Sequence, residues 1–345
     1  MPAIRTTRLS TQQGEINMHR NSEKETRKTA DDQAGPTTEP SQEAVRPEDE
    51  LARLREENLQ LRRQLEAREK SQKRPLTRYQ HIQALKPYQA ELIQLQQSLE
   101  DHGKKMIILF EGRGGAGKGG TIRRITQYLN QKHYRVIALG RPTGEERSQW
   151  FYQKYVREFP CAGEMVLFDH SWYTRATIEP VFGFCTPQEY ENFMEGVSGF
   201  EKDLTNQDII LLKLYFSVSQ QEQMRRFANR KNNVLLRWKL DEADLDAEQY
   251  RDQFTDAKYA MLKSTHTRHA PWTIIRSDNQ HLAHINAMKV ILNAVGYERL
   301  DPGLDITPDP EIAVSGAVEL ERLEAKRLMD GRFCNPCSLF DSTQR

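Results

Sequence analysis

Cysteine and net charge are both scarce in this sequence, and each scarcity excludes a class of protein. Four cysteines among 345 residues are too few for the disulfide framework of a small secreted protein. Lysine and arginine number 50 against 49 aspartates and glutamates, so the chain as a whole has no field that would recruit nucleic acid or a membrane surface. Any anion site must therefore be a local cluster of basic residues.

Long apolar runs are also missing. No run approaches 18 apolar residues, and the N-terminus has no apolar segment of the kind that directs secretion. We therefore expect a cytoplasmic protein with no membrane and no nucleic-acid partner. Hydrophobic residues make up only 37% of the chain, which suggests a folded core with polar extensions.

Aromatic residues are absent from residues 1–50, which also carry mixed charge. A segment of that composition cannot offset the entropy of ordering, so we predict that 1–50 is a disordered extension. Residues 51–74 are predicted to form a short helix. Its leucines fall on the a and d positions of a heptad with Asn58 at an a position, and they are Leu51, Leu54, Leu61 and Leu65. This pattern is compatible with a short coiled coil or with a solvated helix.

Short apolar runs alternate with helical patterns from Tyr79 onward. The runs predicted as strands are 106–110, 135–139, 165–168, 209–218 and 272–275, and the predicted helices are 79–99, 118–131, 146–158, 187–205, 219–231, 247–264 and 281–295. Strands buried on both faces of a parallel sheet have this texture. We predict an α/β domain over 75–300 with a five-stranded parallel sheet, and a C-terminal tail over 301–345 with one helix near 315–329.

A glycine-rich segment, 111–121, lies between the first predicted strand and the next helix. Gly112, Gly117 and Lys118 match the pattern G-x-x-x-x-G-K, in which backbone N–H groups surround phosphate at a helix N-terminus. A glycine-rich turn without a ligand is the alternative, and the strand–helix context argues against it. The residues expected to contact phosphate are Gly112, Arg113, Gly114, Gly115, Ala116, Gly117, Gly119 and Gly120.

Metal binding in such a loop usually relies on a serine or threonine directly after the lysine, but here that position is Gly119 and Thr121 comes two residues later. A carboxylate must take over. Asp169 ends the apolar run 165–168, which is the usual place for an acid that holds Mg²⁺ beside the phosphate loop. A helix cap is the other interpretation of Asp169. With the phosphate loop upstream, we predict Mg²⁺ on Asp169.

Five segments in order resemble the polyphosphate kinase 2 family. Residues 111–122 are similar to its E-G-R-D-A-A-G-K-G-G-T-I pattern, and 169–175 are similar to D-R-S-W-Y-N-R. Residues 148–152 resemble its aromatic segment after the second strand, 226–230 with 236–240 resemble its lid, and 270–272 followed by Asp278 resemble its last motif. The resemblance covers about 79–300.

The resemblance implies a P-loop kinase three-layer sandwich with a helical lid over about 219–264. It implies Mg²⁺-dependent, reversible transfer of phosphate between inorganic polyphosphate and a nucleoside diphosphate, ADP or GDP, to give the triphosphate. It also implies a homo-oligomer, dimer or tetramer. The residues that it suggests are Lys118, Asp169 and Arg175 for catalysis, Arg141 and His170 for phosphate contact, and Arg226, Arg230, Arg237 and Lys239 for polyphosphate binding by the lid.

Several positions depart from the family pattern. The loop aspartate is Gly114 here, and the arginine after the strand-end aspartate is His170, which exchanges a permanent forked cation for a mostly neutral ring. Thr174 replaces an asparagine, 233–234 replace an Asp-Pro, and 279–282 replace a basic stretch. Two alternatives stay open. The departures allow a catalytically weak member that binds polyphosphate or nucleotide as a regulatory subunit, and an ATP-dependent nucleotide kinase of the thymidylate kinase kind would share the loop and an Asp-Arg motif.

Overall fold

The computed structural model describes residues 47–239 and 249–331, except for the side chains of 47, 49 and 66–74. Most of the predicted disordered extension, a short part of the predicted lid and the end of the predicted tail lie outside these residues. The chain divides into two compact units, Met1–Ala67 and Arg68–Arg345. The first unit is described only from Pro47, as the beginning of a helix.

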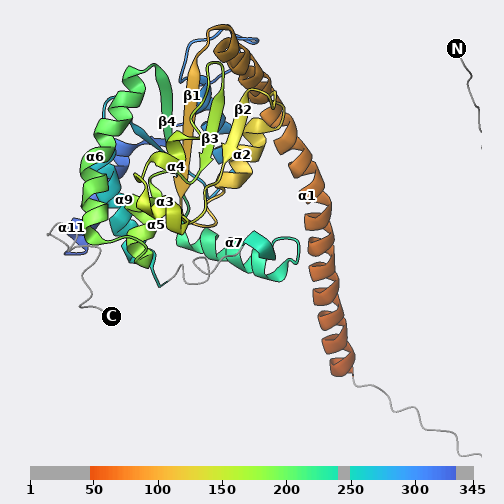
Figure 1. Cartoon of the computed structure of the whole chain (residues 1–345). Helices are drawn as coiled ribbons and strands as arrows, with labels where there is room; N and C mark the ends of the chain where they lie inside the picture. The colour runs from red at the N-terminus through yellow and green to blue at the C-terminus, as the bar shows by residue number, and fades with distance from the viewer. Residues whose placement is uncertain (1–46, 240–248, 332–345) are drawn as a thin grey trace, which may run out of the picture. The chain divides into compact units, whose positions relative to one another are not determined.

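A single sheet forms the centre of the larger unit (Figure 1). Its strand order is β2-β3-β1-β4-β5-β6, and all strands are parallel except β6, which runs antiparallel to β5. The strands are β1 (Lys105–Gly112), β2 (Tyr134–Ile137), β3 (Met165–Asp169), β4 (Ile209–Ser217), β5 (Trp272–Arg276) and β6 (Ala313–Ser315). The α/β class and the five parallel strands are confirmed, but the predicted strand count was one too low.

Helices cover both faces of the sheet, which gives the predicted three layers. The helices of the described residues are α1 (Pro47–Asp101), α2 (Lys118–Thr126), α3 (Gly144–Ser148), α4 (Gln153–Val156), α5 (Thr174–Phe182), α6 (Pro187–Asn206), α7 (Gln220–Asn232), α9 (Arg251–Thr265), α10 (Gln280–Leu292) and α11 (Gly316–Met329), with a short 3₁₀ turn η1 (Arg237–Lys239). The helix α1 continues through both Pro75 and Pro87, so it joins the two helices expected over 51–74 and 79–99.

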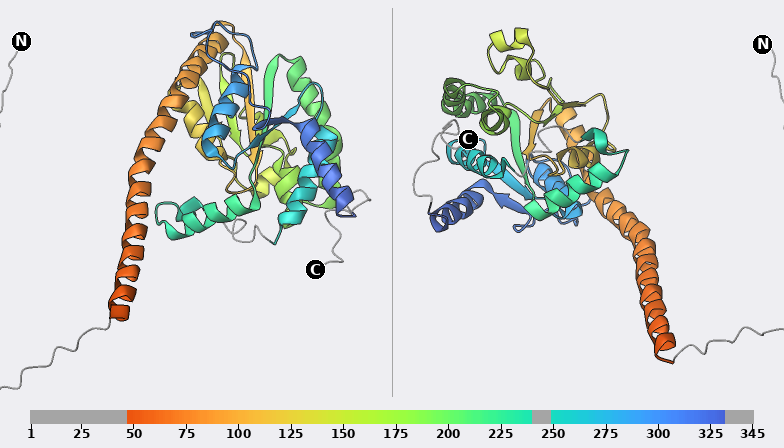
Figure 2. Two further views of the ribbon diagram at one scale, coloured as in Figure 1. Left: turned by 180° about the vertical axis from the view of Figure 1, so that it is seen from behind. Right: turned by 90° about the horizontal axis from the view of Figure 1, so that it is seen from below.

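Two hydrophobic clusters lie on opposite faces of the sheet. Alternate residues of β1 supply both, since Ile108 faces one cluster and Ile107 the other. The first cluster includes α2, α10 and the part of α1 that contains Leu92, and Figure 2 shows these helices from behind. The second includes α5, α6 and α9. This packing fixes the carboxyl ends of β1, β3 and β4, where the predicted site residues lie.

Two predicted segments have a different role in the structure. The predicted lid over 219–264 includes α9, but Met261 and Leu262 of this helix are fully buried against the second face of the sheet. The predicted tail over 301–345 contains β6 and α11, and Val314 of β6 is only 3% exposed in the same cluster. An apolar stripe at helical spacing places α9 in the core, and pairing with β5 draws the start of the tail into the sheet.

Within residues 47–239 and 249–331, no helix has both the length and the apolar character needed to cross a bilayer.

Candidate phosphate-binding site

The phosphate loop depends on glycines at positions where a side chain would not fit. Gly112 ends β1 with φ of 130°, and a Cβ there would lie 2.3 Å from the carbonyl oxygen of Phe216 on β4. Gly117 caps α2 in the left-handed region with φ of 101°. Both conformations are costly for any residue with a Cβ. The loop can therefore pass close to β4 and turn into α2 with its backbone exposed to a ligand.

Lys118 is the first residue of α2, and its side chain is folded over the loop. Its Nζ donates to the carbonyl oxygen of Gly112 at 2.6 Å and lies 3.4 Å from that of Arg113. The residue is only 7% exposed. An ammonium held at this point faces the region enclosed by the loop, where it can act on phosphate as a point charge.

Asp169 and the residue after the lysine lie side by side, although they are far apart in the sequence. A Cβ on Gly119 would lie 3.4 Å from Oδ2 of Asp169. Within the described part of the chain, the Asp169 carboxylate has no hydrogen-bond partner and is partly exposed. The hydroxyl of Thr121 donates instead to the carbonyl oxygen of Gly117 at 3.2 Å, so it does not replace the missing hydroxyl.

Glu111, near the end of β1, is buried, and its carboxylate is hydrogen-bonded to Ser171. It is 1% exposed, and its Oε1 accepts hydrogen bonds of 2.7 Å from both the backbone N–H and the hydroxyl of Ser171. Its Oε2 lies 3.4 Å from Nδ1 of His170, which adopts a left-handed φ of 69°. His170 is therefore held against the base of the loop, between Asp169 and Glu111.

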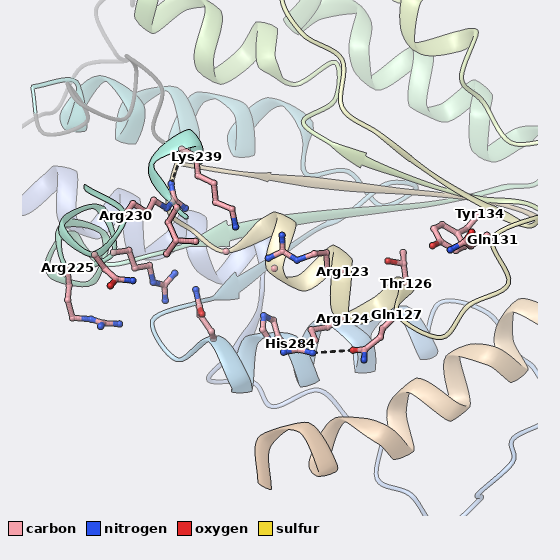
Figure 3. A pocket seen from close by; sticks show the side chains of 16 residues that line it. Arg123, Arg124, Thr126, Gln127, Gln131, Tyr134, Arg225, Arg230, Lys239 and His284 are labelled. Atoms are coloured by element: carbon pink, nitrogen blue, oxygen red, sulfur yellow. Dashed lines mark hydrogen bonds between the residues drawn. The ribbon is translucent and has the colours of Figure 1, made fainter. Parts of the chain in front are cut away.

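A pocket of about 760 Å³ opens beside the N-terminal turn of α2, between α2, α7 and α10 (Figure 3). Six basic side chains line it, and no aspartate or glutamate is found among its described lining residues. The basic residues are Arg123, Arg124, Arg225, Arg226, Arg230 and Lys239. Gly117 and Gly120 of the phosphate loop form part of its wall. The pocket is thus a positively charged extension of the phosphate loop.

The pKa values of two lining residues are lowered by burial first and by the neighbouring positive charges second. Burial, reinforced by the charges of Arg123 and Arg230, lowers the pKa of Lys239. Burial also lowers the pKa of His284 to about 4, and Arg124 contributes the largest charge effect. The Nε2 atom of His284 lies 3.6 Å from the position that a Cβ on Gly120 would take. His284 is consequently a neutral ring at neutral pH, in a position where an anion would favour its protonation.

The helix α7 is fastened to the phosphate loop at its first turns. Gln223 donates to the carbonyl oxygen of Gly114 at 2.8 Å, and Arg226 donates to that of Gly115, also at 2.8 Å. Arg226 also donates to the carbonyl oxygens of Ser277 and Asp278 and is 7% exposed. Much of the hydrogen-bonding capacity of Arg226 is therefore used to join loops. Arg225 is paired with Glu222 through two hydrogen bonds of 2.6 and 2.7 Å, while Arg230 and Lys239 line the pocket (Figure 3).

Four of the six predicted arginines lie outside this pocket. Arg113 donates to Thr255 Oγ1 of α9 at 2.6 Å, and Arg141 stacks on Phe184 with its guanidinium carbon 4.1 Å from the ring centroid. Arg175 is bound to the carboxylates of Glu179 and Glu189 and lies over Phe151. Arg237 is exposed and donates to the carbonyl oxygen of Lys231.

Three basic residues of the pocket were missed by the sequence analysis. Arg123 and Arg124 belong to α2, one turn beyond the phosphate loop, and Arg225 precedes the predicted Arg226. The available signal was their helical spacing, because residues three or four positions after Gly120 lie on the same side of the helix. His284 of α10 gave no local signal, since only the packing of α10 against α2 brings it to the pocket.

Comparison with known proteins identifies the family. The model of the family described as polyphosphate kinase 2 matches residues 76–302. The chain belongs to the polyphosphate kinase 2 family. Several of its members are similar in sequence to this chain. The NDP-polyphosphate phosphotransferase 2 of Ruegeria pomeroyi is 46% identical over 224 residues, which cover 65% of each chain. The GDP-polyphosphate phosphotransferase of Pseudomonas aeruginosa is 42% identical over 68% of this chain and 66% of its own.

A third relative, the ADP-polyphosphate phosphotransferase 1 of Rhizobium meliloti, is 40% identical over 71% of this chain and 81% of its own. The chain therefore spans slightly less than two thirds of the first two relatives and more of the third. Polyphosphate kinase 2 structures also share the fold. A structure from Pseudomonas aeruginosa aligns at a TM-score of 0.59 with 32% identity, covering 62% of this chain and 47% of the other. One from Arthrobacter aurescens aligns at 0.59 with 27% identity, covering 64% and 81%.

Proposed function

We propose that this protein transfers phosphate between inorganic polyphosphate and a nucleoside diphosphate, ADP or GDP, to form the triphosphate reversibly. The observation that carries this proposal is the pocket that continues directly from the phosphate loop and is lined by six basic side chains, two of which, Arg225 and Arg226, are paired with Glu222. A single terminal phosphate needs far fewer cations than this, whereas a chain with about one negative charge per phosphate would be neutralised along its length. The names of the relatives are consistent with this class of substrate.

The residues would act in two groups. Lys118 and the backbone N–H groups of the phosphate loop would hold the phosphoryl group that is transferred, because they converge at the N-terminus of α2. Arg123 of α2 would bind the rest of the polyphosphate together with Arg230 of α7 and Lys239 of η1 (Figure 3). Positioning and charge stabilisation supply most of the catalysis in phosphoryl transfer, so this arrangement is sufficient to account for the reaction.

The donor set also fits Mg²⁺. This ion usually takes one or two protein carboxylates and completes its shell with water and substrate phosphates, so a protein cage is not needed. Among the described residues there is no cluster of three metal-ligating side chains, but Asp169 has a free carboxylate beside Gly119. Bound there, Mg²⁺ would neutralise charge on the transferring phosphoryl group. The small Gly119 leaves space for the ion and its water next to Asp169.

Two of the departures from the family pattern, Gly114 and His170, lie at the phosphate loop, where the buried Nδ1 of His170 has no hydrogen-bond partner among the described residues. The carbonyl oxygen of Gly114 accepts a hydrogen bond from Gln223, and His170 is packed beside Glu111. Lys118 and Asp169 both face the loop. We therefore propose an active transferase rather than a binding subunit.

The decisive experiment measures formation of ATP from ADP, and of GTP from GDP, with polyphosphate and Mg²⁺. Lys118→Met should lower the turnover by about 10²–10³, since electrostatic groups aimed at the transferring phosphoryl group have effects of that size. Arg123→Gln should raise KM for polyphosphate with little change in KM for the nucleotide. Arg322→Gln on α11, which is exposed and outside the pocket, serves as the matched control. Wild-type protein that binds both ligands but forms no triphosphate would contradict the proposal.

A further inference from the structure

A row of exposed leucines runs along the first part of α1, in the smaller unit of the chain. The heptad positions a and d over 51–65 are Leu51, Leu54, Asn58, Leu61 and Leu65, and we refer to them as the seam. All of them lie on a continuous helix. Its four leucines are 50–60% exposed. Four leucines on one stripe of a helix form an apolar surface that favours a partner helix.

The charges that flank the seam indicate what that partner is. In a parallel pair of helices, a g residue faces the e residue five positions later on the partner. The g residues are Glu50 and Glu57, and the e residues five positions later are Arg55 and Arg62. Both contacts therefore join opposite charges when the partner is a second copy of this chain. In an antiparallel pair, g faces g and e faces e, so both kinds of contact would join like charges.

The position of Asn58 favours the same arrangement. An asparagine at an a position meets the asparagine of the partner only when two helices are parallel and in register, and there the two amides can hydrogen-bond. In an antiparallel pair an a residue meets a d residue, and the amide of Asn58 would lie against leucine without a partner. Leucine pattern, flanking charge and buried amide thus agree on one orientation and one register.

We propose that residues 50–65 of α1 bind the same segment of a second copy of this chain as a parallel, in-register, two-stranded coiled coil. The seam spans only about two heptads, whereas a robust coiled coil has at least three or four. The association of this segment should therefore be weak and dependent on concentration. This dimerisation element is separate in sequence from the domain that matches the family, which begins at residue 76.

Disulfide cross-linking of the full chain tests orientation and register together. In a background with the four native cysteines replaced by alanine, Leu54→Cys should give a disulfide-linked dimer under mild oxidation. Parallel d positions bring the two Cα atoms within the limit of about 7 Å. An antiparallel pair centred on Asn58 would separate them by about eight residues, or about 12 Å along the axis. The matched control is Leu59→Cys, because Leu59 is equally exposed at 50% but lies at position b.

Charge reversal supplies a second, independent test. Glu50→Arg with Glu57→Arg places four arginines beside the seam and should reduce cross-linking of the Leu54→Cys variant by about tenfold or more. Adding Arg55→Glu and Arg62→Glu to that chain restores opposite charges across a parallel pair and should restore cross-linking. All these residues are exposed, so the domain should stay folded, which circular dichroism would verify.

Truncation of the seam gives the third measurement. Leu54→Ala with Leu61→Ala should weaken association by more than about 100-fold in sedimentation experiments, because each dimer loses four buried leucines. Leu59→Ala should leave it unchanged. The proposal is overturned if Leu54→Cys cross-links no better than Leu59→Cys, or if the charge-reversed and charge-restored chains behave alike.

Discussion

At the scale of single residues, the pocket is defined by basic groups that lie close enough to perturb one another. His284 is the clearest case, because burial and then the charge of Arg124 lower its pKa to about 4. Its ordinary value is about 6.5, so the unfolded chain takes up a proton between these two pH values while the folded protein does not. Stability is therefore lost as the pH falls from 6.5 to 4.

This linkage gives a prediction for folding. His284→Gln should remove about 2–3 kcal/mol of the acid sensitivity of the free energy of unfolding between pH 7 and pH 4. Urea denaturation at a series of pH values measures it, with the exposed His102→Gln as a control. Curves for wild type and His284→Gln that run parallel across this range would show that the ring is not held neutral by the pocket.

At the scale of elements, the close approach of β1 and β4 dictates the shape of the phosphate loop. Gly112→Ala should destabilise the protein by about 3 kcal/mol or more, because the new Cβ meets the Phe216 carbonyl oxygen and φ is positive. Gly144→Ala in α3 should be neutral within about 0.5 kcal/mol, since nothing lies within 4 Å of its Cβ. Chemical denaturation compares the two variants. Equal effects would mean that the loop can shift away from β4.

Most elements of the domain could be predicted from sequence, because a strand that is buried on both faces of a sheet has a continuous run of apolar residues. The runs 106–110 and 165–168 became β1 and β3, and the glycine pattern between them marked the phosphate loop. The strand β6 was missed because three residues carry too little pattern, and it exists only by pairing with β5. The helix α5 was missed because Pro180 interrupts the helical signal, although the structure accommodates it.

The site residues could be predicted only where they belong to a short motif or follow directly after a strand. Lys118 and Asp169 follow strands whose ends meet at one edge of the sheet, so their proximity could be inferred. Arg123 and Arg124 could not be distinguished from a solvated helix face until α7 and α10 were placed opposite them. Arg175 was predicted to be catalytic from its motif, and the structure pairs it with Glu179 and Glu189, the second of which lies on another helix.

At the scale of the whole molecule, the C-terminal segment is fastened to the sheet by a buried carboxylate. Glu319 of α11 binds Lys258 of α9 at 2.5 Å and Arg276 of β5 at 3.0 Å, and it is 6% exposed. Glu319→Gln should destabilise the domain by about 3 kcal/mol, because it leaves the buried Lys258 ammonium without its counter-charge. Glu321→Gln on the exposed side of α11 is the control. Thermal unfolding measures both, and equal melting temperatures would show that α11 is not held by charge.

The fixation of Arg226 has a mechanical consequence. Its guanidinium holds the carbonyl oxygens of Gly115, Ser277 and Asp278, so the first turns of α7 are a fixed pivot. Beyond a pivot, displacement grows with distance. Arg230 lies one turn away, about 6 Å along the helix axis, and η1 is folded back against it, since Arg230 donates to the carbonyl oxygen of Lys239 at 3.3 Å. A tilt of α7 about its first turns would therefore move Arg230 and Lys239 together, while the end of the pocket at the phosphate loop would keep its width.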